Sequence, residues 1–456
     1  MLPTMMRSRQ AFQLTAVLLG IVTLTLLVFR NGPVRERLAT SSLSNIIPSQ
    51  QHEDEPHEPP HPKYKPTPAF TPPPVTDPFP LLATSTPPPI PQYNVPDIGL
   101  WKALDLKAPP PLIIGFTRSY PVLLQAVVSY ITAGWPPEQI YVVENTGMQQ
   151  ANARGQLTLQ HPWFLDHKAL AKLGVNVVQT PVLLSFAQLQ NFYLSMSYAH
   201  AWPYYFWSHA DVLALGHENG FENLTPRAGE PGYKSLYRLC LEELKRTLDS
   251  DERWGLRFFA YDHLTLQNPR AIEDIGGWDT LIPYYMTDCD TYTRLFMRNW
   301  TQLDANCGVI TDTSTVLDDL LALYRDTTVE AKFTDPNPPP PPPEEEKRDV
   351  AARDEGPNVG DPIEYSIEYW KVLLRVSDQM FHYKHGDRGR NTWQSGQHGG
   401  QGEPFYYDSA GFSEAIDVLT EAGKEVFRRK WGHDNCDLIG GGGLKFGDQW
   451  RVEKDF

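Results

Sequence analysis

The feature that most constrains the fold is an alternation of short apolar runs with amphipathic segments between residues 111 and 260. The apolar runs are rich in Val, Ile and aromatic residues, which is typical of buried strands. We expect strands at 111–118, 139–144, 175–180, 204–215 and 255–260, and helices at 122–133, 185–201 and 234–248. Strands that alternate with helices predict an α/β fold with a mostly parallel sheet and helices on both faces. In such sheets ligands bind at the carboxyl ends of the strands.

The expected helix at 185–201 carries its own start signal. Ser185 is followed three positions later by Gln188, which is the pattern of a capping box. Phe186, Leu189, Tyr193 and Met196 then recur at spacings of three and four, which predicts one apolar helix face.

Residues 10–29 form an uncharged run of 20 residues between Arg9 and Arg30. A helix of this length spans about 30 Å, the thickness of the hydrocarbon core of a bilayer. The alternative is a cleaved signal peptide, whose apolar region is usually about 7–15 residues long and precedes a small-residue cleavage site. The length of the run favours a retained signal anchor, with residues 1–9 as a short cytoplasmic tail.

Proline is concentrated in two segments outside the alternating region. Residues 51–100 contain 16 prolines and show no hydrophobic period, so we expect residues 30–100 to form an extended stem. Residues 335–361 contain the run Pro338–Pro343 followed by mixed charges, and they are predicted to be a disordered insertion. The main folded domain is then expected at 101–334, with its C-terminal part at 362–456.

Charge and glycosylation patterns bear on the compartment. The formal net charge is −15 and no basic block is present, which argues against a nucleic-acid-binding protein. Asn223-Leu224-Thr225 and Asn299-Trp300-Thr301 both match the pattern of an N-glycosylation acceptor. With the short N-terminal tail, these features favour a single-pass membrane protein whose main domain faces the secretory lumen, and we expect the Golgi.

The four cysteines, Cys240, Cys289, Cys307 and Cys436, leave two alternatives open. They are compatible with buried free thiols and equally with a disulfide in a lumenal protein. Their spacing contains no Cys-x-x-Cys pair, so a structural zinc site is not expected.

A strand end supplies the first candidate site. The aromatic residues 204–207 lead into Ser208 and then His209-Ala210-Asp211. In an extended chain, residues i and i+2 point to the same side, so His209 and Asp211 can both reach one divalent ion. A carboxylate suits Mg²⁺ or Mn²⁺, and a His ligand shifts the preference toward Mn²⁺. The alternative is a strand-end turn in which Asp211 caps the next element and His209 lies on the surface.

Four segments in this order resemble the nucleotide-sugar glycosyltransferases of the GT-A fold, in particular the inverting family related to chitin and cellulose synthases. Gln190-Asn191 is similar to the family's Arg-Asn pair, and His209-Ala210-Asp211 is similar to its Asp-x-Asp. The segment 276–279, Gly-Gly-Trp-Asp, resembles the family's Gly-Gly-Phe-Asp. The segment 288–295 resembles the family's Glu-Asp-x-Asp and Arg-Leu segments. The resemblance covers residues 111–295, and Gln190 and His209 depart from the family pattern.

The resemblance implies a GT-A, Rossmann-like sheet and a role for each matching residue. Asp288 is expected to be the catalytic base, and Mn²⁺ or Mg²⁺ is the expected cofactor. The metal ligands would be His209, Asp211 and, from the C-terminal segment, His382. The expected donor-binding residues are Thr117, Arg118, Glu144, Asn145, Asn191 and Asp211. The expected acceptor-binding residues are Gly277, Trp278, Asp279 and Asp290.

Two functions of different classes follow. The first is a metal-dependent glycosyltransferase that moves a sugar from a nucleotide-sugar donor to a glycan, glycoprotein or glycolipid acceptor, with inversion through Asp288. The second is a GT-A-like scaffold that binds a glycan or a partner without turnover, which the His at position 209 motivates. A hydrolase is a weaker third hypothesis, since no Gly-x-Ser-x-Gly segment is present.

Overall fold

The computed structural model describes residues 61–66, 74–334, 362–386, 399–404 and 408–453. The chain divides into two units, residues 1–70 and 71–456, and the helices and strands given below belong to the second. The predicted membrane span at 10–29 and the predicted insertion at 335–361 lie outside the described residues. Within those residues, no helix combines the length and the apolar character needed to cross a bilayer.

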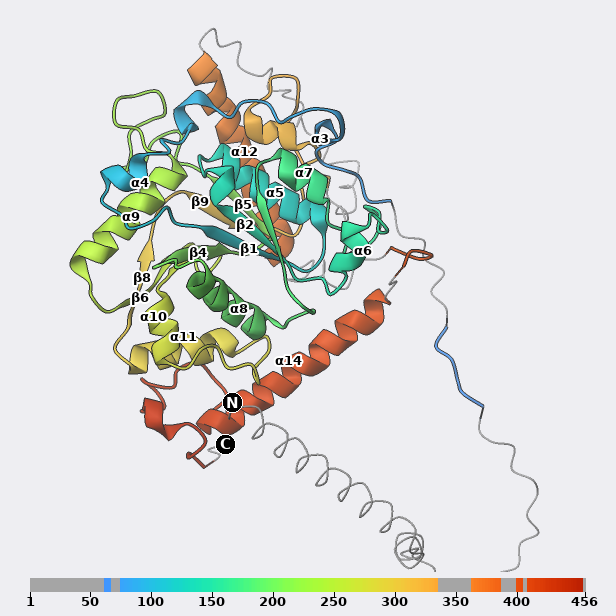
Figure 1. Cartoon of the computed structure of the whole chain (residues 1–456), viewed down its shortest axis with the longest axis vertical. Helices are drawn as coiled ribbons and strands as arrows, with labels where there is room; N and C mark the ends of the chain where they lie inside the picture. Colours follow the sequence, from blue (N-terminus) through green and yellow to red (C-terminus); the bar gives the residue numbers. More distant parts are fainter. Residues whose placement is uncertain (1–60, 67–73, 335–361, 387–398, 405–407, 454–456) are drawn as a thin grey trace, which may run out of the picture. The chain divides into compact units, whose positions relative to one another are not determined.

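Two sheets and a set of flanking helices make up the second unit (Figure 1). The strands are β1 Leu112–Phe116, β2 Ile140–Glu144, β3 Asn176–Gln179, β4 Tyr205–Ser208, β5 Val212–Leu215, β6 Trp254–Phe259, β7 Leu264–Gln267, β8 Thr301–Ala305 and β9 Val309–Asp312. The α-helices are α3 Leu81–Thr84, α4 Leu100–Ala103, α5 Tyr120–Thr132, α6 Gln149–Ala153, α7 His167–Lys172, α8 Phe186–Ala199, α9 Leu236–Ser250, α10 Pro269–Asp274, α11 Thr287–Met297, α12 Pro362–His385 and α14 Ser409–Trp431. The 3-10 helices are η1 Gln92–Asn94, η2 Pro137–Gln139, η3 Leu320–Tyr324 and η5 Phe446–Asp448.

The main sheet confirms the predicted mixed α/β architecture. Its seven strands lie in the order β3-β2-β1-β4-β7-β6-β8. The neighbours from β3 to β4 are parallel, as are β6 and β8, and β7 is antiparallel to both of its neighbours. The sheet is therefore mostly parallel and Rossmann-like, and the carboxyl ends of β1, β2 and β4 meet at one edge.

The single strand predicted at 204–215 is wrong. It is two strands, because the chain leaves the main sheet after β4, and β5 pairs antiparallel with β9 in a separate two-stranded sheet. Both halves are buried, and the less buried residues from His209 to Asp211 separate them. The turn between them carries His209 and Asp211.

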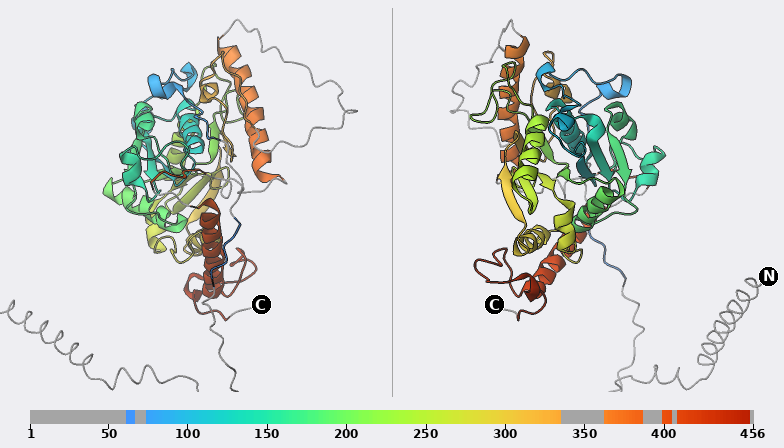
Figure 2. Two further views of the ribbon diagram at one scale, coloured as in Figure 1. Left: turned by 90° about the vertical axis from the view of Figure 1, so that its right-hand side faces the viewer. Right: turned by 60° about the vertical axis from the view of Figure 1, so that its left-hand side comes forward.

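Helices cover both faces of the main sheet, as predicted (Figure 1). Leu112 and Ile114 of β1 point to the face that packs on α5, α9 and α12, whereas Ile113 points to the face under α8. Helix α8 confirms the predicted capping box: the amide of Gln188 donates to Ser185 Oγ at 3.4 Å, and Gln188 Oε1 accepts from the amide of Ser185 at 2.9 Å. The views in Figure 2 show α12 and α14 as long rods on the outside of this unit.

The folded unit begins earlier than the expected boundary at residue 101. Phe79 and Leu82, which lie within the expected stem, are buried in the main hydrophobic core. The amide of Leu320 also donates to the carbonyl of Pro78 at 2.8 Å. The sequence does not predict the burial of Phe79 and Leu82, because two apolar residues among many prolines form no hydrophobic period.

One disulfide settles the alternatives for the cysteines. Cys289 in α11 is bonded to Cys436, which follows α14, whereas Cys240 and Cys307 are buried free thiols. Phe427 and Trp431 of α14 pack on Ile282 in the same region. The disulfide and this packing hold the C-terminal segment against α11.

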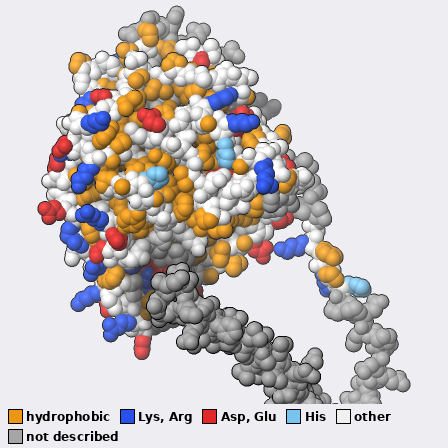
Figure 3. Space-filling view, in the orientation of Figure 1, with side chains coloured by type: hydrophobic (Ala, Val, Ile, Leu, Met, Phe, Trp, Pro, Cys, Tyr) orange, Lys and Arg blue, Asp and Glu red, His pale blue; other side chains and the backbone are white. Residues whose placement is uncertain are grey.

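Charged side chains of both signs lie around the rim of the face shown in Figure 3. Helix α9 carries the ion pairs Arg238–Glu242 and Lys245–Asp249. Each pair is at i,i+4 spacing and partly exposed, so solvent screens it and it adds little to stability.

Candidate active site

Polar residues from separate parts of the chain follow the carboxyl ends of β1, β2 and β4. Thr117 and Arg118 come after β1, Glu144 and Asn145 stand at the end of β2, and the turn at 209–211 comes after β4. This is the edge at which ligands bind in open parallel sheets. The tertiary structure adds two carboxylates to it: Asp262, from the turn between β6 and β7, and Asp312, at the end of β9.

His209 and Asp211 lie together, as the strand-end spacing predicts. His209 Nδ1 is 3.7 Å from Asp211 Oδ1, and His209 Nε2 is 3.7 Å from Asp262 Oδ1. Burial alone would lower the pKa of His209, but the close contact with Asp211 and the charges of Asp262, Asp211 and Asp312 raise it to about 9. His209 is therefore a cation at neutral pH, and its side chain is 31% exposed.

Lys384 of α12 reaches the same carboxylates from the other side. Its ammonium donates to Asp211 Oδ2 at 2.7 Å, to Asp312 Oδ1 at 2.5 Å and to the carbonyl of Thr313 at 3.4 Å. His385 Nε2 lies 2.7 Å from Asp312 Oδ2. Burial raises the pKa of Asp211, but His209 and Lys384 outweigh that effect and hold this pKa well below its usual range.

This donor set does not fit a divalent ion. A metal bound to Asp211 would meet the Lys384 ammonium on the same carboxylate, and two cations that close repel each other. The third expected ligand, His382, lies elsewhere: its side chain is 72% exposed and pairs with Asp378 at 3.5 Å. In the part of the chain that the structure describes, no group of three or more His, Cys, Asp or Glu side chains has the arrangement of a metal site.

Asp288 stands in the first turn of α11, where backbone N–H groups and the helix dipole favour a carboxylate. The Tyr261 hydroxyl donates to Asp288 Oδ2 at 3.1 Å. Burial raises the pKa of Asp288, and the charge of Asp262 raises it further. A carboxylate with a raised pKa is a better proton acceptor than an ordinary Asp.

A strained turn carries the side chains around Asp288. Ala260 and Tyr261 have φ values of 59° and 57°, which non-glycine residues seldom adopt. The next residue, Asp262, accepts a hydrogen bond of 3.0 Å from the hydroxyl of Tyr292 in α11. The turn thus places a hydroxyl on Asp288 and a carboxylate beside His209.

The structure gives Gly277 and Trp278 a packing role. Asn191 clamps the Trp278 backbone: its Oδ1 accepts from the Trp278 amide and its amide nitrogen donates to the Trp278 carbonyl, both at 2.9 Å. Gly277 has φ 86°, and a Cβ there would lie 2.9 Å from Asn191 Oδ1. Trp278 is only 2% exposed and packs against Phe186 and Tyr292, so its ring face is not open to a sugar.

The other two residues expected to bind the acceptor, Asp279 and Asp290, are engaged in a buried charge network. Lys430 of α14 donates to Asp279 Oδ2 and contacts Asp290 Oδ1, both at 2.7 Å. Asp290 also accepts from Arg294 at 2.8 Å and from the Trp431 indole at 2.9 Å. Asp290 is fully buried, so this network holds α14 on α11.

The polar residues at the end of β2 form a second cluster whose hydrogen-bonding groups have partners within the chain. Glu144 is fully buried and accepts hydrogen bonds from Asn152 at 2.8 Å and Gln179 at 2.9 Å, while His167 Nε2 lies 2.9 Å away. Burial raises the pKa of Glu144, but these hydrogen bonds outweigh it and lower the pKa below the usual range.

Asn145 and Arg118 also have partners within the chain. Asn145 accepts from the amide of Leu184 at 2.7 Å and donates to Thr117 Oγ1 at 3.4 Å. The Arg118 guanidinium lies over the ring of Phe412, 4.7 Å from its centroid. These contacts place Thr117, Arg118 and Asn145 at the edge of the candidate site and tie the loop before α8 to it.

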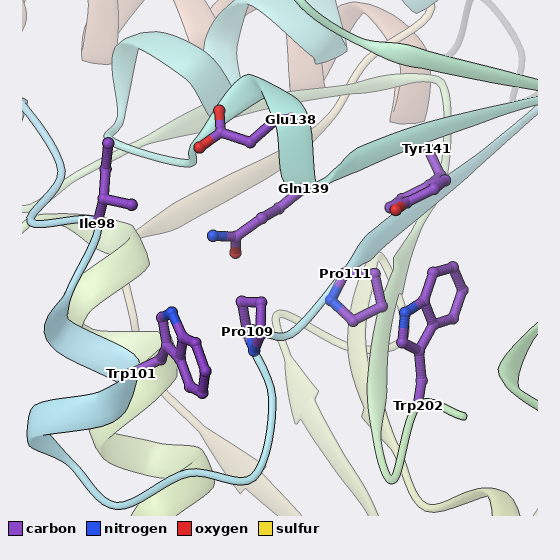
Figure 4. A pocket seen from close by; sticks show the side chains of 8 residues that line it. All are labelled: Ile98, Trp101, Pro109, Pro111, Glu138, Gln139, Tyr141 and Trp202. Atoms are coloured by element: carbon purple, nitrogen blue, oxygen red, sulfur yellow. The ribbon is translucent and has the colours of Figure 1, made fainter. Parts of the chain in front are cut away.

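A cavity of about 280 Å³ lies away from this site, at the amino ends of β1 and β2 (Figure 4). Its walls are formed by Ile98, Trp101, Pro109, Pro111, Glu138, Gln139, Tyr141 and Trp202. Because the candidate residues follow the opposite ends of these strands, the cavity is not part of the candidate active site.

Sequence reasoning missed Asp262 and Asp312, and for Lys384 it favoured a polar loop over a contact with the donor diphosphate. Asp262 lies in a short turn and Asp312 ends a strand of the second sheet, so neither belongs to a local motif. Lys384 instead lies in the last turn of helix α12.

No family model matches the chain, and no curated protein matches it. Among solved structures, it is similar to the mannosyltransferase PcManGT from Pyrobaculum calidifontis, in complex with GDP-Man and Mn²⁺. That match has 15% identity and a TM-score of 0.29 and spans 45% of this chain but only 60% of the mannosyltransferase. A cytidylyltransferase from Leptospira borgpetersenii serovar Hardjo-bovis matches at 10% identity and a TM-score of 0.27, over 45% of this chain and 82% of that protein. At these scores neither likeness carries an argument about function.

Proposed function

We propose that this protein is a glycosyltransferase that moves a sugar from a nucleotide-sugar donor to a glycan, glycoprotein or glycolipid acceptor. The observation that carries the proposal is Asp288. It is a half-buried carboxylate with a raised pKa near the ligand-binding edge of a mostly parallel sheet. Within the described residues, no Lys or Arg forms an ion pair with it, whereas Asp211, Asp279 and Asp290 each have a Lys partner.

The proposed reaction is a direct displacement. The acceptor hydroxyl gives its proton to Asp288 while its oxygen attacks the anomeric carbon of the donor sugar. The bond between that carbon and the phosphate oxygen breaks, and the nucleoside diphosphate leaves with the electron pair. Attack opposite the leaving group inverts the anomeric centre. Tyr261 orients the base through the hydrogen bond to Asp288 Oδ2.

The leaving diphosphate needs positive charge, and this chain offers it from side chains. His209 is cationic and partly exposed, and Arg118 stands at the end of the neighbouring strand β1. The resemblance implies Mn²⁺ or Mg²⁺ at Asp211, but Lys384 already occupies that carboxylate. The proposed steps therefore involve no metal.

We also propose that residues 10–29 anchor the protein as a single-pass type II protein of the Golgi or another secretory membrane. The uncharged run of that length supports the anchor, and the two sequons support the lumenal orientation. Glycosidase treatment of protein expressed in a secretory host would shift its electrophoretic mobility if the sequons are lumenal, and unchanged mobility would contradict this orientation.

The test uses the full chain in detergent. Thermal shifts with a panel of nucleoside diphosphates identify which nucleotide the protein binds. The nucleotide sugars that contain this nucleotide are then assayed for transfer and hydrolysis. Asp288→Asn keeps an acceptor for the Tyr261 hydroxyl but cannot take a proton. We expect it to lower the transfer rate about 10²–10⁴-fold without changing the melting temperature.

The matched control is Asp304→Asn, because Asp304 is an exposed carboxylate in β8. This variant should transfer sugar at the normal rate. Full activity of Asp288→Asn would exclude Asp288 as the base. A folded chain that binds no nucleotide from the panel would instead favour the non-catalytic scaffold.

A further inference from the structure

The Lys384 ammonium occupies the place where the sequence predicts a divalent cation. It bridges Asp211 Oδ2 at 2.7 Å and Asp312 Oδ1 at 2.5 Å, and the Thr313 carbonyl at 3.4 Å faces the same nitrogen. Its side chain is only 4% exposed. Two carboxylates and a carbonyl around one point are the oxygen ligands that Mg²⁺ and Mn²⁺ prefer, but here an ammonium fills the point.

Lys384 is held in place by its helix. It is the penultimate residue of α12, whose residues Trp370, Leu373 and Met380 are buried in the main core. The next residue, His385, binds the second oxygen of Asp312 at 2.7 Å. Two consecutive side chains of one packed helix therefore bind the two carboxylates. A metal that enters would have to displace Lys384.

The charge balance gives this arrangement a function. Asp211 and Asp312 would present two negative charges at the edge where a donor diphosphate must bind, and like charges there would repel it. One buried lysine removes much of this repulsion without any ion from solution. His209, whose side chain is 31% exposed and lies 3.7 Å from Asp211, is not needed as a metal ligand in this arrangement.

We propose that Lys384 is a built-in counter-charge that replaces the divalent cation, so that nucleotide binding and sugar transfer by this chain do not depend on added metal. The statement about nucleotide binding and sugar transfer rests on the proposed function. The contact of Lys384 with Asp211 and Asp312 is independent of any nucleotide. Removal of Lys384 should turn the vacated carboxylate pair into a metal site.

The first experiment uses Mn²⁺ alone as the probe. Full-length protein in detergent, stripped with a chelator, is titrated with Mn²⁺, and the free ion is followed by electron paramagnetic resonance. We expect the wild type to bind Mn²⁺ at least tenfold more weakly than Lys384→Ala. The control Lys371→Ala, on an exposed part of the same helix, and Lys384→Arg, which keeps the charge, should both behave like the wild type.

Loss of Lys384 leaves two poorly balanced buried carboxylates, so Lys384→Ala is expected to be unstable in chelator. In that case its folded yield is compared with and without Mn²⁺ during purification. Recovery by Mn²⁺ supports the proposal. Failure to recover, or a wild type that binds Mn²⁺ as tightly as the variant, overturns it.

The second experiment takes the nucleotide found in the thermal-shift panel. Wild-type affinity should change less than twofold between chelator and Mn²⁺, whereas Lys384→Ala should bind only with Mn²⁺. A wild type that needs Mn²⁺ to bind the nucleotide overturns the proposal. Absence of nucleotide binding in both proteins would refute the proposed function but leave the Mn²⁺ titration to decide on Lys384.

Discussion

Lys430 offers the sharpest test of how the C-terminal helix supports the site. Its ammonium joins Asp279 and Asp290, both at 2.7 Å, and its side chain is 3% exposed. Removing one partner of a buried ion pair costs about 3–5 kcal/mol. Asp290 keeps its bonds to Arg294 and Trp431, and Asp279 is 19% exposed and can be hydrated. We therefore expect Lys430→Met to lower the free energy of unfolding by about 3 kcal/mol, the lower end of that range.

The ion pair between Lys430 and Asp279 also predicts how stability depends on pH. Burial raises the pKa of Asp279, but the hydrogen bond and charge of Lys430 outweigh it and lower the pKa below the usual value. A carboxyl whose pKa is depressed by folding stabilises the protein above its unfolded pKa, and this stability is lost as the pH falls through the folded pKa. Lys430→Met should therefore be less sensitive than the wild type to acid below about pH 4.

The assay is urea unfolding followed by tryptophan fluorescence, with hydrogen exchange of α14 as a local probe. Lys424→Met is the matched control, since Lys424 lies on the same helix in an exposed pair with Glu421. It should change stability by less than about 0.5 kcal/mol. A loss below about 1 kcal/mol in Lys430→Met, with unchanged exchange in α14, would refute the idea that this buried network holds the helix.

Three further predictions concern the proposed base Asp288, the disulfide and the turn at Gly277. Because the pKa of Asp288 is raised, the transfer rate should fall with decreasing pH at a higher pH than an ordinary carboxyl near 3.9 would give; a pH–rate profile without such an acid limb contradicts the assignment. Cys436→Ser removes the disulfide to Cys289, which lies 147 residues away, and should lower the free energy of unfolding by about 2–4 kcal/mol, measured by thermal unfolding. An unchanged melting temperature would show that packing alone holds the C-terminal segment. Gly277→Ala should cost about 1–3 kcal/mol through its positive φ and the contact with Asn191, measured by urea unfolding; a neutral effect would mean that the turn relaxes.

The sequence by itself determined the layered α/β plan. Hydrophobic periodicity is a local property, so the strands β1 to β3, the helix α8 and its capping box could all be predicted from neighbouring residues. The spacing of His209 and Asp211 likewise placed both side chains on one side of the chain, and they lie 3.7 Å apart.

What only the tertiary structure decided is which partners each charged side chain meets. Asp211 is separated from Lys384 by 173 residues and Asp279 from Lys430 by 151, and no local pattern connects positions so far apart. The placement of β4 and β5 in different sheets was also decided by distant residues, because β4 pairs with β1 and β7 whereas β5 pairs with β9. An ionisable side chain takes its role from the charges that surround it in space. The residue expected to hold a metal is therefore, once folded, the partner of a lysine.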